Sequence, residues 1–217
     1  MPPRHTPPGP EDLVRAARAH GVRDERLLES LRRVPRDRFV PPEWVGQAYG
    51  DRPIPIPHGQ VTTQPSLVAQ MLAALSLEGT ERVLEVGTGL GFQTALLALL
   101  AAEVFSVERH ADLAAWALRN LEAAGLGGPT VVVGDGSLGL PEHAPFDGVV
   151  VSAASPRVPP PLIDQLAEGG RLVSPLGPGG MEDVVSFRKR GHRVIRERLV
   201  TPAHFVRLVG RHGAAEG

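Results

Sequence analysis

Hydrophobic and polar positions follow two alternating patterns from Pro65 to about residue 175. Short apolar runs, which predict strands, are followed by longer amphipathic stretches, which predict helices. The expected strands are 82–86, 103–107, 130–133, 148–151 and 171–175, and the expected helices are 65–76, 92–102, 111–124 and 161–167. Strands that alternate with helices are typical of a parallel sheet with helices on both faces. We therefore expect an α/β fold with a Rossmann-like, doubly wound, mainly parallel sheet.

The part of the chain before this α/β unit follows other patterns. Two stretches, 11–19 and 24–34, have apolar residues at helical spacing, so we expect N-terminal helices there. The proline-rich stretch 41–59 carries Trp44 and Tyr49, and we expect it to be a long, stiff and ordered loop.

The C-terminal part predicts an antiparallel hairpin. The runs 184–188 and 193–200 flank Arg190-Gly191-His192, a typical turn signal, and 204–209 is a candidate for a further strand. The expected organisation is a disordered tail (1–10), N-terminal helices with a covering loop (11–64), an α/β domain that forms one compact unit with them (65–210), and a flexible tail (211–217).

Composition narrows the classes of function. The 217 residues include no cysteine, which excludes disulfides, thiolate metal sites and cysteine nucleophiles. The formal net charge is −1, so we expect neither nucleic acid nor a membrane as a partner. No histidine pair has the spacing of a helical metal site, so no metal is expected. The N-terminus lacks a signal peptide and no apolar run could span a bilayer, so a cytoplasmic protein is expected.

A glycine-rich turn follows the first strand of the α/β unit. The segment Val83-Leu84-Glu85-Val86-Gly87-Thr88-Gly89-Leu90-Gly91-Phe92 reads as a strand, a turn and a helix start. Glycines permit positive φ angles and let the backbone approach a ligand, and the helix start offers free N–H groups. The G-x-G-x-G spacing differs from the dinucleotide pattern G-x-G-x-x-G. The segment indicates a nucleotide-like ligand, although a tight structural turn also favours glycine.

Two acidic residues follow the next two strands. Glu108 comes directly after 103–107, where it can accept hydrogen bonds from both hydroxyls of a ribose. Asp135 follows 130–133, where it can accept from an adenine amino group while Gly136 leaves room for the ring. Alone, either acid would be an ordinary solvated or turn residue. Because the carboxyl ends of neighbouring parallel strands share one edge of the sheet, the combination predicts an adenosyl cofactor.

Together with these motifs, the chain resembles the protein-L-isoaspartate O-methyltransferase family over about 200 residues. The segments that carry the resemblance are Arg33-Val34-Pro35-Arg36, Phe39-Val40-Pro41, the block from Ala48 to Ile56, the block from His58 to Pro65, the glycine turn, Gly134-Asp135-Gly136 and Val151-Ser152-Ala153-Ala154. The glycine turn and the GDG motif occur in many methyltransferases, whereas the stretch from Tyr49 to Pro65 points to this family. The resemblance implies the class I S-adenosylmethionine methyltransferase fold, with S-adenosyl-L-methionine as the cofactor.

The resemblance also implies roles for individual residues. The family's loop usually reads G-Q-T-I-S-Q-P with a serine near the reacting carboxylate, and Thr63 stands at the serine position here. Threonine keeps the hydroxyl, so Thr63 is the expected catalytic residue and Thr62 is the alternative. A purely structural alternative is that the Thr63 hydroxyl caps the helix that begins at Pro65. The expected cofactor-binding residues are Thr62, Gln64, Glu85, Gly87, Thr88, Gly89, Gly91, Glu108, Arg109, Asp135 and Gly136. The expected substrate-binding residues are Ile56, His58, Gln60, Phe205 and Val206.

The implied reaction transfers a methyl group from the cofactor to the α-carboxylate of an L-isoaspartyl residue, as a step of protein repair. The expected partners are isoaspartyl-containing proteins and peptides, and the expected state is a monomer. Such a carboxylate has a pKa of roughly 3.5 and is ionised at neutral pH, so no general base is required. The site has to align the carboxylate and exclude water.

Three alternatives stay open at this point. A methyltransferase for RNA or a small molecule would share the cofactor residues and differ in the acceptor loop. Val61 and Thr62 depart from the family pattern there, and Arg207 replaces a proline of the C-terminal pattern F-V-P-L. A non-catalytic cofactor-binding protein could use the same fold. A nicotinamide enzyme is disfavoured by the glycine spacing and by Asp135.

Overall fold

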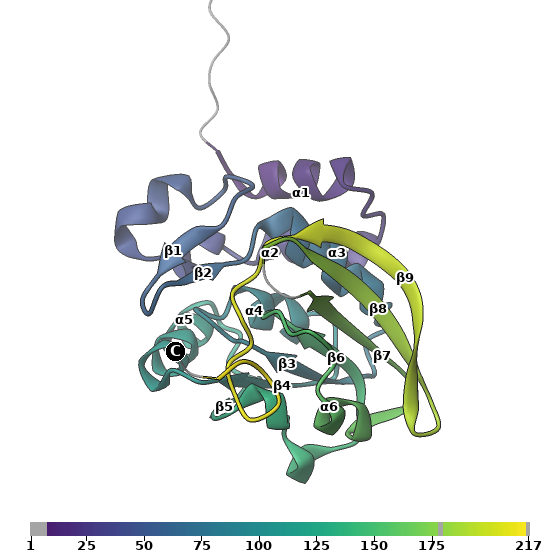
Figure 1. Cartoon of the computed structure of the whole chain (residues 1–217). Coiled ribbons are helices and arrows are strands. Elements are labelled where there is room, and N and C mark those ends of the chain that lie inside the picture. Colours follow the sequence, from purple (N-terminus) through teal and green to yellow (C-terminus); the bar gives the residue numbers. More distant parts are fainter. Residues whose placement is uncertain (1–7, 178–179, 216–217) are drawn as a thin grey trace, which may run out of the picture.

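A seven-stranded sheet forms the centre of the computed structural model, which describes residues 8–177 and 180–215 (Figure 1). Its strand order is β5-β4-β3-β6-β7-β8-β9. The strands are β3 (Arg82–Val86), β4 (Glu103–Glu108), β5 (Thr130–Val133), β6 (Phe146–Val151), β7 (Leu166–Leu176), β8 (Glu182–Arg190) and β9 (Arg193–Ala203). Neighbours from β5 to β7 pair in parallel, whereas β8 and β9 pair antiparallel. The mainly parallel sheet and the C-terminal hairpin are therefore confirmed.

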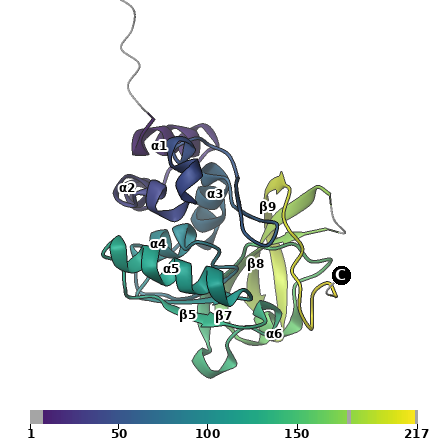
Figure 2. The ribbon, with the colours of Figure 1, turned by 90° about the vertical axis from the view of Figure 1, so that its left-hand side faces the viewer.

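Helices cover both faces of the sheet, as the two views show (Figures 1 and 2). They are α1 (Pro10–Ala19), α2 (Glu25–Arg33), α3 (Pro65–Leu75), α4 (Phe92–Ala98), α5 (Ala111–Ala123) and α6 (Pro160–Asp164), with short 3-10 turns η1 (Arg36–Phe39), η2 (Pro42–Gln47), η3 (Gly136–Leu138) and η4 (Pro141–His143). Successive side chains of a strand point to opposite faces. Val83 and Val150 pack in the core with α1 to α4, whereas Leu84 and Val149 pack with α6. This alternation buries both faces.

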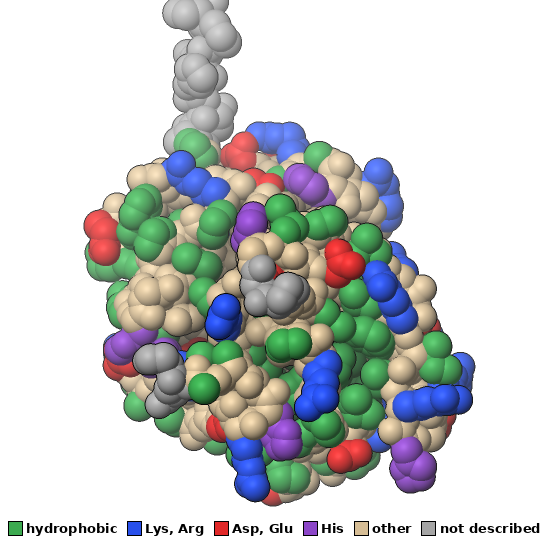
Figure 3. Space-filling view, in the orientation of Figure 1, with side chains coloured by type: hydrophobic (Ala, Val, Ile, Leu, Met, Phe, Trp, Pro, Cys, Tyr) green, Lys and Arg blue, Asp and Glu red, His purple; other side chains and the backbone are tan. Residues whose placement is uncertain are grey.

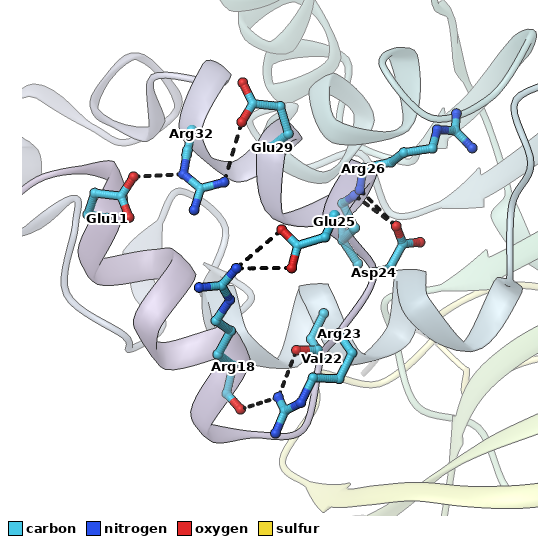
Figure 4. Close-up of polar contacts among 10 residues, drawn as sticks. Glu11, Arg18, Val22, Arg23, Asp24, Glu25, Arg26, Glu29 and Arg32 are labelled. Carbon is cyan, nitrogen blue, oxygen red and sulfur yellow. Dashed lines mark hydrogen bonds and ion pairs between the residues drawn. The ribbon is translucent and has the colours of Figure 1, made fainter.

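Surface ion pairs join the two N-terminal helices (Figure 4). Asp24 caps the start of α2. Arg18 of α1 pairs with Glu25 of α2 at 3.0 Å, and Arg32 of α2 pairs with Glu11 of α1 at 2.7 Å. Exposed pairs of this kind contribute little to stability. The main contribution comes from the buried apolar side chains of both helices, which pack with those of α3.

The proline-rich stretch before α3 is more regular than the loop that the sequence predicts. It contains η2 and an antiparallel hairpin of β1 (Ile54–Ile56) and β2 (Gln60–Thr62). Proline is tolerated here because the strands are short and Pro55 faces solvent. The turn is made by His58 and Gly59, which have φ angles of 61° and 65°. The hairpin lies between the N-terminal helices and α5 (Figure 1).

Two predicted helices extend too far. The helix expected at 161–167 ends at Asp164, and β7 already begins at Leu166. A short apolar run is compatible with a helix or a strand. Here Leu166 pairs with Phe146 of β6, so the chain forms a strand from Leu166 onwards. The helix expected at 92–102 ends at Ala98.

The chain after β9 crosses the carboxyl edge of the sheet, and the further strand expected at 204–209 is wrong. Residues 204–215, called the C-terminal segment below, run back from β9 towards β5 (Figure 1). A single parallel bridge links Arg207 to Ala154. The backbone N–H of Ala154 donates to Val206, and that of Leu208 donates to Ala154. Too few positions pair for a strand to form.

The two chain ends are only partly described. Within the expected disordered tail 1–10, residues 1–7 lie outside the described residues, and Pro10 begins α1. Within the expected flexible tail 211–217, residues 216–217 lie outside them, whereas Arg211 to Ala214 make backbone hydrogen bonds. In the part of the chain that is described, no helix is both long and apolar enough to cross a membrane.

Candidate active site

A cleft opens where β3 and β4 end, between the β1–β2 hairpin and the C-terminal segment. The space between its walls is about 900 Å³ when the open mouth is included. The glycine turn after β3 forms its floor. Because β5, β4 and β3 are parallel neighbours, their carboxyl ends share this edge, as the sequence predicts.

The three glycines of the turn serve different purposes. Gly87, Gly89 and Gly91 have φ angles of 97°, 57° and 94°, a region that residues with a Cβ rarely adopt. Gly87 and Gly89 line the cleft together with Thr88. Gly91 does not line it and instead precedes α4, where a Cβ would lie 3.3 Å from the Cβ of Ala117. The first two glycines therefore shape the cleft, and the third lets α4 approach α5.

Glu108 at the end of β4 is the buried carboxylate of the cleft. Its Oε2 accepts a hydrogen bond from the backbone N–H of Gly89 at 2.9 Å, and its Oε1 accepts one from that of His110 at 3.0 Å. Each carboxylate oxygen can accept a further hydrogen bond. The backbone therefore fixes the carboxylate while it keeps acceptor capacity for a ligand.

The end of β5 contributes to two neighbouring pockets. Gly136 lines the cleft, and a Cβ there would lie 2.4 Å from Val86 Cγ1, so only glycine fits. Asp135 lines an adjoining pocket instead, which shares Arg109 and Val209 with the cleft. Its Oδ1 accepts from the backbone N–H and hydroxyl of Ser137, and its Oδ2 accepts from the backbone N–H of Arg211. Burial acts to raise the pKa of Asp135, but these hydrogen bonds outweigh it and lower that pKa.

A buried polar cluster supports the floor of the cleft. Glu85 is fully buried and does not line the cleft. Its carboxylate accepts hydrogen bonds from the hydroxyls of Ser106 and Thr94 and from the side-chain amide of Gln93. Burial raises the pKa of Glu85 to about 7, against these hydrogen bonds, with a smaller contribution from the charge of Glu108. Glu85 therefore acts on the cleft through Gln93.

Thr62 and Thr63 both line the cleft, but their hydroxyls differ. The Thr62 hydroxyl accepts from the guanidinium of Arg36 at 3.1 Å and from the backbone N–H of Ile54 at 3.2 Å. Among the described residues, none makes a hydrogen bond with the Thr63 hydroxyl. Thr62 therefore holds the hairpin, and Thr63 has the hydroxyl that can meet a ligand.

Arg36 is the buried cation at the base of the hairpin. Its guanidinium donates to the backbone carbonyls of Ala48, Gly50 and Arg52 and to the Thr62 hydroxyl. It also lies 5.5 Å from the ring of Phe92, which lines the cleft. Burial lowers the pKa of Arg36 to about 10, and Asp51 partly offsets this. The residue remains a cation at neutral pH and fixes the stretch that covers the cleft.

Three other expected site residues lie outside the cleft lining. His58 is at the turn of the hairpin, where its Nε2 lies 2.8 Å from a carboxylate oxygen of Asp112 on α5. Its ring stacks on that of His110 with centroids 4.1 Å apart. Gln64 is the N-cap residue of α3, and Phe205 packs against the core. These contacts attach the covering segments to the fold.

The structure brings the remaining expected residues together in the cleft. They include Arg109 among the cofactor residues and Ile56, Gln60 and Val206 among the substrate residues. Among the other lining residues are the polar side chains of Gln93 and Ser152, for which no role was expected. Two polar residues, Gln93 and Thr94, at the start of a helix that is otherwise apolar are a signal that could have pointed to Gln93. Among the described residues, no cluster of histidine, aspartate and glutamate could hold a metal ion.

Comparison with known proteins gives one consistent result. The family model described as protein-L-isoaspartate(D-aspartate) O-methyltransferase matches residues 9–213. A protein-L-isoaspartate O-methyltransferase of Methanoculleus marisnigri is 52% identical over 196 residues, which are 90% of this chain and 89% of the relative. A relative of the same description from Koribacter versatilis is 47% identical and covers 90% of this chain and 88% of its own length.

A solved structure described as protein-L-isoaspartate O-methyltransferase superposes with a TM-score of 0.80 at 27% identity. The match covers 94% of this chain and 66% of that one. A Plasmodium falciparum protein described as a beta-aspartate methyltransferase, solved with S-adenosyl-L-homocysteine, also has a TM-score of 0.80, at 22% identity over 93% of this chain and 98% of its own. At that identity, the second structure shows a shared fold.

Proposed function

The chain belongs to the protein-L-isoaspartate(D-aspartate) O-methyltransferase family, and we propose that the cleft at the ends of β3 and β4 is its active site. A member of this family is a protein repair methyltransferase with S-adenosyl-L-methionine as cofactor and isoaspartyl proteins as substrates. The observation that carries the assignment is the buried Glu108 carboxylate, which the backbone fixes at the end of β4 beside the glycine turn.

The residues present fit this cofactor. Glu108 keeps the acceptor capacity that two ribose hydroxyls need. Gly136 lines the cleft where its backbone packs against Val86, since a Cβ there would clash with that side chain, and Gly87 and Gly89 allow close approach to the floor. Thr62, Thr88 and Arg109 complete the cofactor side in this proposal. Asp135 directly precedes Gly136, which lines the cleft, and it lines the adjoining pocket. In this proposal its carboxylate accepts a hydrogen bond from the adenine amino group.

The chemistry asks little of the protein beyond alignment. When bound, the cofactor supplies an electrophilic methyl group on its sulfonium. The acceptor carboxylate is already ionised at neutral pH, so the chain needs no general base. We propose that the Thr63 hydroxyl donates a hydrogen bond that orients the carboxylate for in-line attack. The hairpin and the C-terminal segment exclude water, which would otherwise solvate a weakly nucleophilic anion.

We propose that the peptide enters between the two covering segments. Ile56 and Gln60 of the hairpin and Val206 of the C-terminal segment line this side of the cleft. Arg207 lines it too, at the position where the family pattern has proline. In this proposal His58 and Phe205 act by holding the covering segments in place.

Four further assignments are part of the proposal. The enzyme is cytoplasmic and monomeric, it has no nucleic-acid partner, and residues 11–210 act as one compact unit. The net charge of −1 and the acidic side chains that lie among the basic ones in Figure 3 argue against a polyanion. The shared core of α1 to α4 with the sheet supports the single unit. Gel filtration would check the oligomeric state, and an RNA filter-binding assay would check for nucleic-acid binding.

The decisive test compares two peptides that differ in one linkage. Purified protein is incubated with methyl-labelled S-adenosyl-L-methionine and an isoaspartyl peptide, beside the same peptide with a normal aspartyl residue. We expect alkali-labile label on the isoaspartyl peptide alone. Equal labelling of both peptides would contradict the substrate assignment. Cofactor binding without labelling of either would indicate a different acceptor or a non-catalytic role.

A further inference from the structure

One buried polar atom in the cleft has no partner within the protein. Gln93 is 7% exposed and lines the cleft from the first turn of α4. Its Oε1 has no hydrogen-bond partner among the described residues. A buried acceptor left without a donor is costly, so such atoms usually have a ligand or a water.

The neighbours of Gln93 fix which end of its amide faces outward. Its Nε2 donates to Glu85 Oε1 at 3.0 Å and to Ser152 Oγ at 3.0 Å. Glu85 is fully buried and its second oxygen accepts from the hydroxyls of Thr94 and Ser106. Above its pKa of about 7, Glu85 is ionised and its oxygens only accept, so a flipped amide would then place two acceptors in contact. The cluster therefore presents Oε1, an acceptor, to the cleft.

The position of this acceptor relative to Glu108 identifies the part of the ligand that it meets. Ser152 follows β6, and a Cβ on Gly87 would lie 3.3 Å from the Cβ of Ser152. Glu108 follows β4 on the other side of β3. Ser152, which is hydrogen-bonded to Gln93, therefore lies about two strand spacings from Glu108 along this edge, and each spacing is about 4.8 Å. With the ribose at Glu108, the other end of the cofactor, its amino acid moiety, extends towards Gln93.

The amino acid moiety carries an ammonium group, which is a donor and a cation. The hydrogen-bonded Glu85 carboxylate polarises the amide of Gln93 and makes Oε1 a stronger acceptor. On the basis of the proposed function, we infer that Gln93 Oε1 accepts a hydrogen bond from the α-ammonium group of the cofactor. Gln93 thereby selects for ligands that carry this group, and Glu85 and Ser152 position it.

A binding cycle tests the inference without turnover. The probes are S-adenosyl-L-homocysteine and its analogue without the amino group, 5′-S-(3-carboxypropyl)-5′-thioadenosine, titrated by calorimetry into wild type, Gln93→Met and Gln93→Leu. A charged hydrogen bond contributes about 1.5–3 kcal/mol, which corresponds to about 10- to 100-fold in affinity. We expect each variant to lose at least tenfold affinity for the first probe and less than threefold for the second. Gln70→Met, on α3 outside the cleft lining, is the matched control and should change neither.

Equal losses for both probes in the Gln93 variants would overturn the inference, because they would show a structural role only. Unchanged affinity for both probes would overturn it as well, and so would a wild type that binds the two probes equally. Failure of the wild type to bind S-adenosyl-L-homocysteine would instead contradict the proposed function. Thermal unfolding of each variant shows whether the protein is folded. Where a variant is not folded, the preference of the wild type between the two probes still tests the inference.

Discussion

The two sides of the cleft are built in different ways. One side, the cofactor wall, consists of the ends of β3, β4 and β5 and holds Gly87, Gly89, Glu108 and Gly136. The other side, the cover, consists of the β1–β2 hairpin and the C-terminal segment. Strand pairing and backbone N–H groups fix the wall. The side chain of Arg36 fixes the base of the hairpin, and two backbone hydrogen bonds with Ala154 attach the C-terminal segment.

This difference separates two tasks of a methyltransferase. The wall has to present the same acceptors to the same cofactor, and paired strand ends are rigid enough to do so. The cover has to admit a peptide and then exclude water, which requires a segment that can move. A cover attached by a few hydrogen bonds can open when those bonds break. Substitutions at the wall should therefore alter cofactor affinity, and substitutions in the cover should alter stability of the hairpin and use of the peptide.

The largest expected effect tests whether Arg36 holds the cover. In Arg36→Met, the carbonyls of Ala48, Gly50 and Arg52 lose their donor, so we expect the free energy of unfolding to fall by about 4 kcal/mol. The peptide KM should rise at least tenfold. Urea unfolding and steady-state kinetics measure both. Arg33→Met, an exposed arginine of α2, should change the free energy of unfolding little. Similar losses in the two variants would contradict the role of Arg36.

The next prediction concerns Glu85, which supports the cofactor wall, and the pH dependence of the free energy of unfolding. The folded pKa of Glu85 is about 7, above its ordinary value of 4.5, so its contribution to stability is fully present below about pH 4.5. It is lost as the pH rises through 7, because the folded protein then has to ionise a buried group. Between pH 4.5 and 8, the free energy of unfolding of wild type should fall by about 3 kcal/mol more than that of Glu85→Gln.

Urea unfolding of both proteins at several pH values gives this difference, and the other titrating groups cancel because the two proteins share them. Parallel curves for wild type and Glu85→Gln would show that Glu85 does not change its ionisation in this window.

A smaller effect separates the two threonines of the cover. Thr63→Val should lower kcat about tenfold with unchanged affinity for S-adenosyl-L-homocysteine, because a single orienting hydrogen bond is lost. Thr62→Val should instead lower the free energy of unfolding by about 1 kcal/mol, since Arg36 and the Ile54 N–H lose their acceptor. Kinetics and thermal unfolding of both variants measure this. The reverse pattern would assign the catalytic hydroxyl to Thr62.

The smallest effect concerns the contact of the hairpin turn with α5. His58 and Asp112 are both largely exposed, so their pair is screened by solvent. We expect His58→Ala to raise the release rate of S-adenosyl-L-homocysteine by less than about threefold, measured by stopped-flow fluorescence. A tenfold change would mean that the turn holds the cover more firmly than its exposure indicates.

The same contrast explains what the sequence could predict. The bounds of β3 and β5 agree with the expected 82–86 and 130–133, because an apolar run between turn residues predicts a strand locally. The shared edge of Gly87, Glu108 and Gly136 followed from the parallel arrangement of strands. The wall is thus a consequence of local patterns and one topological rule.

The cover and the supporting cluster depend on contacts between residues far apart in the sequence. The hydroxyl of Thr62 is engaged by Arg36, 26 positions earlier, and no local pattern shows this. Glu85 reads as part of the glycine motif, yet it acts from behind the turn through Gln93. The C-terminal segment is joined to Ala154 by one bridge, and the sequence pattern of 204–209 alone could not distinguish this arrangement from a strand.

The proposed placement of the cofactor depends on Glu108 as an acceptor, and one titration tests this most directly. Calorimetry with S-adenosyl-L-homocysteine compares wild type with Glu108→Ala and with Glu103→Ala, an exposed glutamate at the other end of the same strand. Loss of two charged hydrogen bonds should weaken binding by about 100-fold or more in Glu108→Ala, with wild-type affinity in Glu103→Ala. Equal affinity of wild type and a folded Glu108→Ala protein would contradict the placement of the cofactor in this cleft.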